Sequence, residues 1–182
     1  MQVLSAGFAG PAYGAIAGAA FTLLLGAVCV SDLRTRRIPN KLVLVIAVLG
    51  IVYSVASHPW LPGIGRALGG LGVGLALWFP FFLFGMLGAG DVKFFAAASA
   101  WIGATAALEA ALLSALFGGV LAIGSLVVSH GWRGAALAAA TAKQGGIPSD
   151  SQAARSGKKL PYGLAMAAGL AVAAWFPHIF SR

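Results

Sequence analysis

Long apolar runs separated by short polar connections dominate the chain. The runs Gly7 to Val30, Leu42 to Ser57 and Ala67 to Leu87 hold no charged side chain, and ~20 apolar residues let a helix cross a hydrocarbon layer of ~30 Å. The pattern predicts membrane-spanning helices over residues 11–30, 42–57, 67–87, 92–108, 110–129 and 161–180. We therefore expect an all-α, polytopic membrane protein, a bundle of about six transmembrane helices in a single domain over residues 1–182.

Prolines and glycines mark the ends and the contact faces of these helices. Pro39 and Asn40 offer a turn and a cap before the second helix, and Pro161 opens the last one at a position that tolerates proline. Small residues four apart, such as Gly70 and Gly74, let two backbones approach closely where no hydrophobic effect drives helices together. These small residues predict close packing between helices rather than loosely packed surfaces that face lipid.

Composition narrows the class of protein further. Hydrophobic residues make up 60% of the chain and charged residues 9%, with 12 lysines and arginines against four acids, whereas soluble domains carry about 25% charged residues. This composition excludes a soluble enzyme, a disordered tail and a secreted disulfide scaffold. The single cysteine, Cys29, leaves no internal disulfide and no cysteine zinc cluster. We expect no metal and no other cofactor.

The basic residues lie between the apolar runs, where they indicate orientation. A nucleic-acid site would need them clustered on one folded face, so we expect no nucleic-acid partner. If the first connection is cytoplasmic, only Arg66 and Arg182 fall on the opposite side of the bilayer, against ten basic residues on the cytoplasmic side. This bias predicts periplasmic termini and a cytoplasmic loop over 130–160, polar and rich in Gly and Ser from 141. Because no lysine or arginine precedes Arg34, we expect the first run to be a retained span.

The four acids differ in where they fall. Glu109 lies between the fourth and fifth predicted helices, where it would cap or solvate a turn, and Asp150 lies in the polar loop. Asp32 and Asp91 each stand at the cytoplasmic end of an apolar run, at similar depth. Carboxylates at this boundary are costly, and they mark either a functional site or interface anchors.

A pair of carboxylates has chemistry that a single one lacks. Two carboxyl groups a few Å apart share a proton, which leaves one base and one acid near neutral pH. The base can activate a water molecule and the acid can protonate a peptide carbonyl. Gly88 and Gly90, just before Asp91, would let backbone approach an extended substrate. The alternative is an ion pair of Asp32 with Arg34 and of Asp91 with Lys93.

Two segments resemble the signature motifs of type IV prepilin peptidases, which are intramembrane aspartic proteases of the Gly-x-Gly-Asp class. They are Ser31 to Asn40 (Ser-Asp-Leu-Arg-Thr-Arg-Arg-Ile-Pro-Asn) and Gly88 to Lys93 (Gly-Ala-Gly-Asp-Val-Lys). A third piece, Leu160 to Gly163 (Leu-Pro-Tyr-Gly), is similar to the family's Pro-Tyr/Phe-Gly segment. Gly-x-Gly-Asp alone is a weak signal, but the three pieces together, in this order, are a strong one.

The resemblance carries over residue by residue. Asp32 and Asp91 match the catalytic aspartates, Gly88 and Gly90 match the motif glycines, and Lys93 matches a frequent trailing lysine that supports the motif or the substrate. The implied activity is removal of the leader peptide from prepilins and pseudopilins at the cytoplasmic face of a bacterial inner membrane. Ile38, Pro39 and Asn40 match family positions that we interpret as structural; the resemblance leaves the oligomeric state open.

The chain also departs from the longer members of this family. Those members carry an N-terminal region with four cysteines and an N-methylating activity, whereas this chain has few residues before its first apolar run and one cysteine. We therefore expect no N-methyltransferase region. The compact form resembles peptidases of Flp-type, tight-adherence pilus systems, which implies Flp-type prepilins as substrates.

Two other functions stay open at this point. A small transporter or proton-relay protein also uses buried acids, although a relay needs ionisable groups near the midplane, where the predicted helices have none. An inactive assembly subunit of a pilus machine is the third possibility, which the intact motifs disfavour.

Overall fold

The computed structural model describes residues 12–35, 37–143 and 162–176. They form six helices: α1 (Ala12–Thr35), α2 (Asn40–Ser57), α3 (Trp60–Leu83), α4 (Ala89–Ile102), α5 (Ala104–Lys143) and α7 (Tyr162–Trp175). The described part of the chain contains no strand. The all-α prediction is therefore confirmed.

The helices differ in whether they are long enough to span a bilayer. Four have the length and hydropathy to do so: Gly14–Thr35, Asn40–Ser57, Trp60–Leu83 and Ala104–Ala122. α4 and α7 have 14 residues each. The helices predicted over 92–108 and 161–180 are therefore present but shorter than expected.

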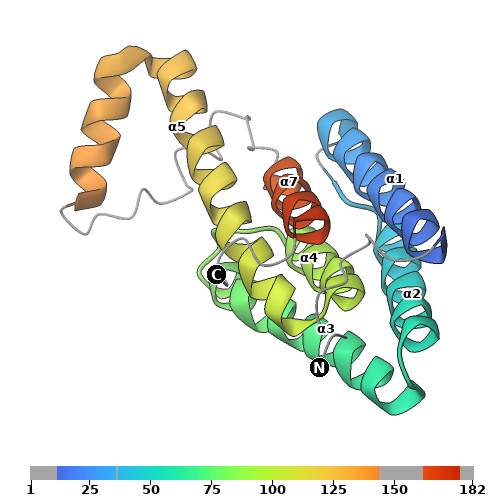
Figure 1. Ribbon diagram of the computed structural model, residues 1–182. Helices are drawn as coiled ribbons and strands as arrows, with labels where there is room; N and C mark the ends of the chain where they lie inside the picture. The colour runs from blue at the N-terminus through green and yellow to red at the C-terminus, as the bar shows by residue number, and fades with distance from the viewer. Residues whose placement is uncertain (1–11, 36, 144–161, 177–182) are drawn as a thin grey trace.

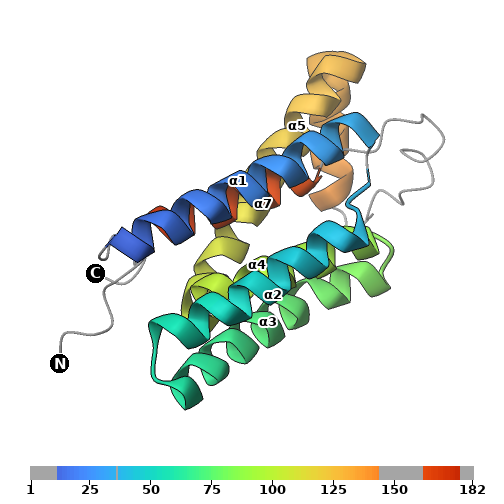
Figure 2. The ribbon, with the colours of Figure 1, turned by 90° about the vertical axis from the view of Figure 1, so that its right-hand side faces the viewer.

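The helices are arranged in two layers. α1 and α7 lie side by side in one layer, and α2, α3 and α4 form the other (Figures 1 and 2). α5 contacts α7 in the first layer and α3 and α4 in the second, so it packs against both layers.

α4 is the interior helix of the bundle. All its residues from 94 to 102 are buried, and α2, α3, α5 and α7 contact it. A helix that is apolar on all sides is expected to be buried on all sides. Trp101 anchors it to α2, because its Nε1 donates a hydrogen bond of 2.9 Å to the Ile46 carbonyl and its ring stacks on Tyr53.

α3 packs against its neighbours through small residues. Its buried positions are three or four residues apart: Gly63, Ala67, Gly70, Gly74 and Trp78. A Cβ at residue 70 would collide with the Ser99 carbonyl of α4, and one at residue 74 would lie 2.6 Å from Ser99 Oγ. The close approach predicted from Gly70 and Gly74 is confirmed.

Gly70→Ala is expected to destabilise the bundle. The added methyl group meets α4 backbone, which cannot rotate away, and overpacking of this kind costs about 1–3 kcal/mol. Gly72→Ala is the matched control, since a Cβ there has open space and alanine favours a helix over glycine. Thermal unfolding of the detergent-solubilised variants measures the difference; equal melting temperatures for both would contradict the packing argument.

The outward faces of the helices are apolar. Large side chains such as Ile16, Leu23, Leu112 and Leu116 are 63–75% exposed, while glycines and alanines fill much of the interior. In a membrane, large side chains face lipid and small residues form the helix contacts. This distribution, with four helices long enough to span, is that of an integral membrane protein.

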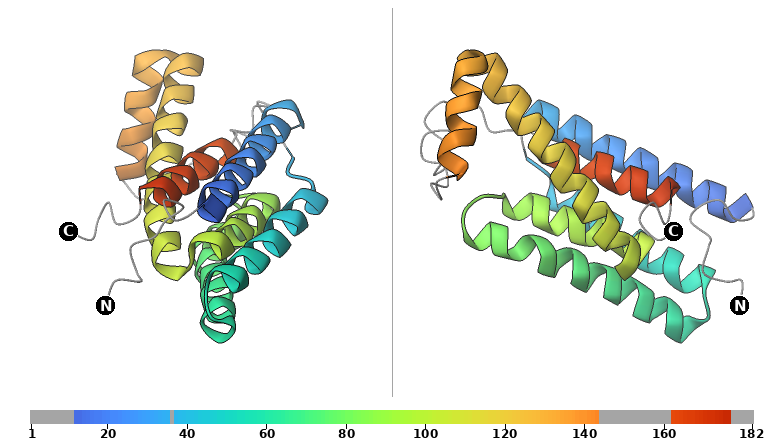
Figure 3. Two further views of the ribbon diagram at one scale, coloured as in Figure 1. Left: turned by 45° about the vertical axis from the view of Figure 1, so that its right-hand side comes forward. Right: turned by 60° about the vertical axis from the view of Figure 1, so that its left-hand side comes forward.

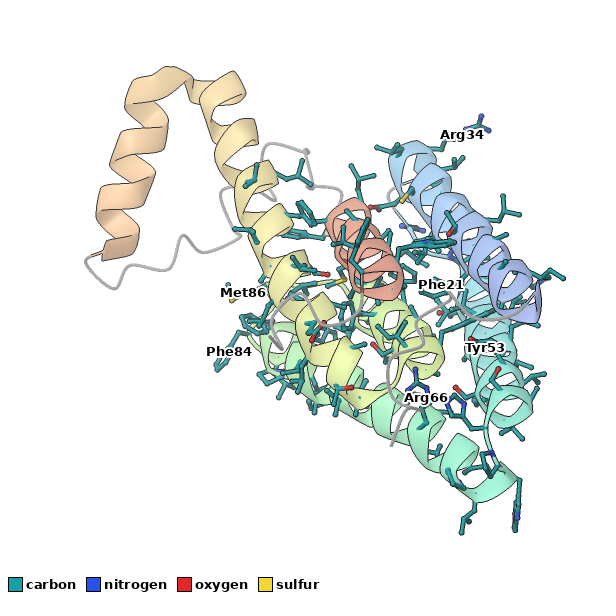
Figure 4. All side chains as sticks on the ribbon, in the orientation of Figure 1. Phe21, Arg34, Tyr53, Arg66, Phe84 and Met86 are labelled. Atoms are coloured by element: carbon teal, nitrogen blue, oxygen red, sulfur yellow. The ribbon has the colours of Figure 1, made fainter. Side chains whose placement is uncertain are left out.

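The two ends of the bundle carry different polar groups. The C-terminal end of α1, the start of α2 and the start of α4 lie at one end (Figure 2), where Arg34 points away from the bundle (Figure 4). At the other end, Arg66 Nη2 donates a hydrogen bond of 2.8 Å to the Ile102 carbonyl at the end of α4. A cation there satisfies a terminal carbonyl and is favourable to the helix dipole.

Gly103 separates α4 from α5 and corrects one sequence interpretation. Its φ of +83° lies in the left-handed region that side-chain-bearing residues rarely adopt, so the helix break falls there. The sequence predicts that Glu109 lies in the turn between two helices, but it lies inside α5.

α5 is longer than the predicted helix over 110–129. It continues to Lys143, so residues 130–143 of the expected loop are helical, and the rest of that loop lies outside the described residues. The alanine-rich sequence before Lys143 explains the difference, because alanine has the highest helix propensity. The last turns of α5 stand apart from the other helices (Figures 1 and 3).

Candidate functional site

Asp32 continues the buried stripe of α1. The buried residues of this helix are three or four apart: Gly14, Gly18, Phe21, Leu25, Val28 and Asp32. Asp32 is 6% exposed, so its carboxylate faces the neighbouring helices rather than the surroundings. A carboxylate at an interior position next to a membrane is costly to keep, which is why such residues usually serve a function.

Asp91 lies in the first turn of α4, next to the glycine that caps the helix. The Gly88 carbonyl accepts hydrogen bonds from the N–H groups of Asp91 and Val92 at 3.1 and 3.3 Å. The Asp91 carboxylate in turn accepts a hydrogen bond from the Gly88 N–H, as the third helical residue does in one half of a capping box. A Cβ at residue 88 would lie 3.0 Å from Asp91 Oδ2. Gly88 therefore leaves the room that this carboxylate needs.

Asp32 and Asp91 interact electrostatically. Asp91 precedes the buried apolar stretch of α4 and lies outside the four long spans. Burial and the negative charge of Asp32 raise the pKa of Asp91 to about 6, and the hydrogen bond from Gly88 opposes this rise. Two carboxyl groups coupled in this way hold a shared proton more readily than isolated ones. The sequence prediction that these two acids lie at the same end of the bundle agrees with this coupling.

α7 connects the two helices that carry these acids. No Cα atom of α1 lies within 8 Å of one in α4, whereas α7 contacts both helices. At the opposite end, α1 and α4 meet through side chains, with the rings of Phe21 and Trp101 5.2 Å apart. At the end where the carboxyls lie, α7 approaches Asp32, and a Cβ at residue 163 would lie 2.7 Å from Asp32 Oδ2.

The two signature segments contact each other through Ile38 and Gly90. A Cβ at residue 90 would lie 3.7 Å from Ile38 Cβ, an ordinary van der Waals distance, so Ile38 packs next to the α4 backbone at a position where alanine would also fit. The connection before Ile38 is held by the Arg37 carbonyl, which accepts a hydrogen bond of 3.0 Å from Ser31 Oγ and lies 3.1 Å from Thr35 Oγ1. Gly88 and Gly90 thus have contacts within the chain, in addition to any with a substrate.

Lys93 lies away from the two carboxylates. It is two residues after Asp91, which places it on the other side of α4 because each residue turns a helix by about 100°. There it lines a groove of ≈ 330 Å³ between α2, α3 and α4, with Asn40 as the other polar residue of a mostly apolar wall. The sequence grouped Lys93 with Asp91, but the structure separates their side chains.

Ser31, Thr35 and Gly163 make contacts at the site that the sequence did not predict. Their place inside the three motif segments is the one signal that singles them out. Across the described ranges, His, Cys, Asp and Glu side chains form no group of three or more that could hold a metal ion.

Comparison with known proteins identifies relatives of this chain. The type IV leader peptidase family matches residues 19–123. A protein from Xanthomonas campestris pv. campestris, the prepilin leader peptidase/N-methyltransferase, is 33% identical over 121 residues. That match covers 63% of this chain and 41% of the relative, so the chain spans less than half of the relative's length. No solved structure matches the chain.

Proposed function

Since the chain belongs to the type IV leader peptidase family, we propose that it is an intramembrane aspartic endopeptidase that removes leader peptides from prepilins. Asp32 and Asp91 are its two catalytic aspartates. The observation that supports this proposal is the electrostatic interaction of these two acids, which lie 59 residues apart in the sequence but at the same end of the bundle.

 The two acids are contributed by α1 and α4, and α7 contacts both of these helices.

The reaction follows from a pair of carboxyl groups that share one proton. The ionised carboxylate takes a proton from water as the water oxygen attacks the carbonyl carbon of the scissile peptide bond, and the protonated carboxyl gives its proton to the carbonyl oxygen. The C–N bond then breaks as the nitrogen receives a proton, which releases an amine and a carboxylic acid. Because the pair titrates as a unit, base and acid are roles of the pair.

The substrates are prepilins and pseudopilins of the Flp type, cut at the cytoplasmic edge of their apolar helix. The motifs that resemble this family support the reaction, and the charge bias of the connections supports a cytoplasmic site in a bacterial inner membrane, with both termini periplasmic. In this orientation Asp32 and Asp91 lie at the depth where a substrate helix leaves the bilayer.

Coexpression with a candidate Flp-type prepilin tests the proposal. We expect the prepilin to lose its leader peptide, with a mass that places the cut at the cytoplasmic end of its apolar helix. A prepilin of unchanged mass, in membranes that contain the peptidase, would contradict the proposed activity. Reporters of membrane topology fused after Lys41 and after Lys93 test the orientation, and reporters on opposite faces would contradict it.

A further inference from the structure

We propose that Gly163, in the first turn of α7, is a positioning residue that holds the Asp32 carboxylate in its working orientation toward Asp91. This inference rests on the proposed function, in which Asp32 and Asp91 act as a pair. Nothing in that function requires a glycine at this position, so the evidence for it is the packing of α7 on α1.

The packing around Gly163 leaves no room for a side chain. A Cβ at this residue would lie 2.7 Å from Oδ2, 3.1 Å from Cγ and 3.4 Å from Cβ of Asp32. Gly163 is buried, as is Asp32, which is 6% exposed. Its φ is not in the left-handed region, so the requirement for glycine is one of space and not of backbone conformation. The α7 backbone thus forms one wall of the space that the Asp32 carboxylate occupies.

α7 is suited to this role because it is itself held firmly in the bundle. Gly169, further along α7, packs on Ser114 and on the Ala110 carbonyl of α5, and Ser114 Oγ donates a hydrogen bond of 3.3 Å to the Met166 carbonyl. α7 also contacts α4, which carries Asp91. The wall against Asp32 is therefore fixed relative to both aspartates.

An alanine at residue 163 must displace either the Asp32 carboxylate or the start of α7. The contact with Oδ2 is shorter than van der Waals separation, and the carboxylate is the group with the freer torsions. A displacement of about 1 Å in a reacting group costs roughly 100-fold in rate. We expect Gly163→Ala to lower kcat by about this factor, with KM for the prepilin unchanged because the substitution is buried and leaves the outer surface of the bundle as it is.

Two other glycines at the contact of α5 and α7 serve as matched controls. Gly169→Ala creates a more severe clash, because its Cβ would meet the Ser114 and Ala110 backbone of α5, and this clash does not involve Asp32. Gly118→Ala places its Cβ at 3.9 Å from Ala165 and Tyr162, an ordinary contact. If glycine at residue 163 serves packing alone, Gly163→Ala will resemble Gly169→Ala and lose stability and activity together. If it positions Asp32, the loss of kcat in Gly163→Ala will exceed the loss in Gly169→Ala at an equal or higher melting temperature.

Labelling of carboxyl groups tests the same inference without any substrate. In the intact detergent-solubilised protein, a water-soluble carbodiimide with an amine nucleophile modifies accessible carboxyl groups, and mass spectrometry of peptides gives the extent at Asp32. We expect weak labelling in the unmodified chain and in Gly118→Ala, and labelling several-fold stronger in Gly163→Ala. Equal labelling of Asp32 in Gly163→Ala and the unmodified chain would overturn the inference, even if the chain cleaves prepilin. A labelling difference in a chain that cleaves no prepilin would support the positioning of Asp32 and count against the proposed function alone.

Discussion

Replacing either Asp32 or Asp91 with asparagine is expected to abolish prepilin processing while the protein still accumulates in the membrane. Asparagine has nearly the shape of aspartate, but it cannot take up a proton from water or hold one for the carbonyl oxygen. General acid and base catalysis contribute about 10²–10⁴-fold each, so each substitution is expected to lower cleavage by at least about 10²-fold. The fraction of coexpressed prepilin that retains its leader peptide, measured by mass, gives the result.

Glu109→Gln is the matched control for these two substitutions. It makes the same change from acid to amide, but Glu109 lies in α5, near the turn at Gly103 and at the end of the bundle opposite to Asp32 and Asp91. We expect this variant to process prepilin at the normal rate. Normal processing by Asp32→Asn or by Asp91→Asn would show that the two acids do not form the catalytic pair.

The all-α fold and the choice of acids could be predicted from the sequence, because both depend on local signals. Long apolar runs determine helices, and a chain with four acids draws attention to the two that end such runs. The position of Asp32 on the buried stripe of α1 is also visible in the sequence, since it continues the spacing of Phe21, Leu25 and Val28. The break at Gly103 was missed because apolar residues continue on both sides of it, and hydropathy does not report φ.

The contacts between the motifs could not be predicted in the same way. Whether Ile38 packs on Gly90, or Gly163 on Asp32, depends on how α1, α4 and α7 are placed relative to one another, and residues far apart in the sequence decide this. The separation of Lys93 from Asp91 was predictable in principle, since side chains two positions apart on a helix point in nearly opposite directions. A match to the motif residues does not by itself show on which face of the helix each residue lies.

Asp91 is expected to lower the stability of the protein at neutral pH, because its carboxyl group is buried and lies near the charge of Asp32. Its pKa is raised from the ordinary value of 3.8 to about 6, first by burial and then by the charge of Asp32. Between these two pH values the folded protein keeps a proton that the unfolded chain has lost, so the free energy of unfolding falls as the pH rises. Above about pH 6 both states are ionised and the full penalty remains, at most about 3 kcal/mol for a shift of this size.

Asp91→Asn removes this penalty because the amide does not ionise. The variant is therefore expected to melt at a higher temperature than the unmodified chain at pH 7–8, with the difference shrinking as the pH is lowered through 6 toward 4. Melting temperatures of the two detergent-solubilised proteins across this range measure the effect, and Glu109→Gln controls for the loss of one negative charge. A difference that stays constant with pH, or a variant that is less stable at pH 8, would contradict the raised pKa of Asp91. The expected pattern is a gain in stability at the same position where catalysis is lost, as for a carboxylate that is kept for its chemistry and not for the fold.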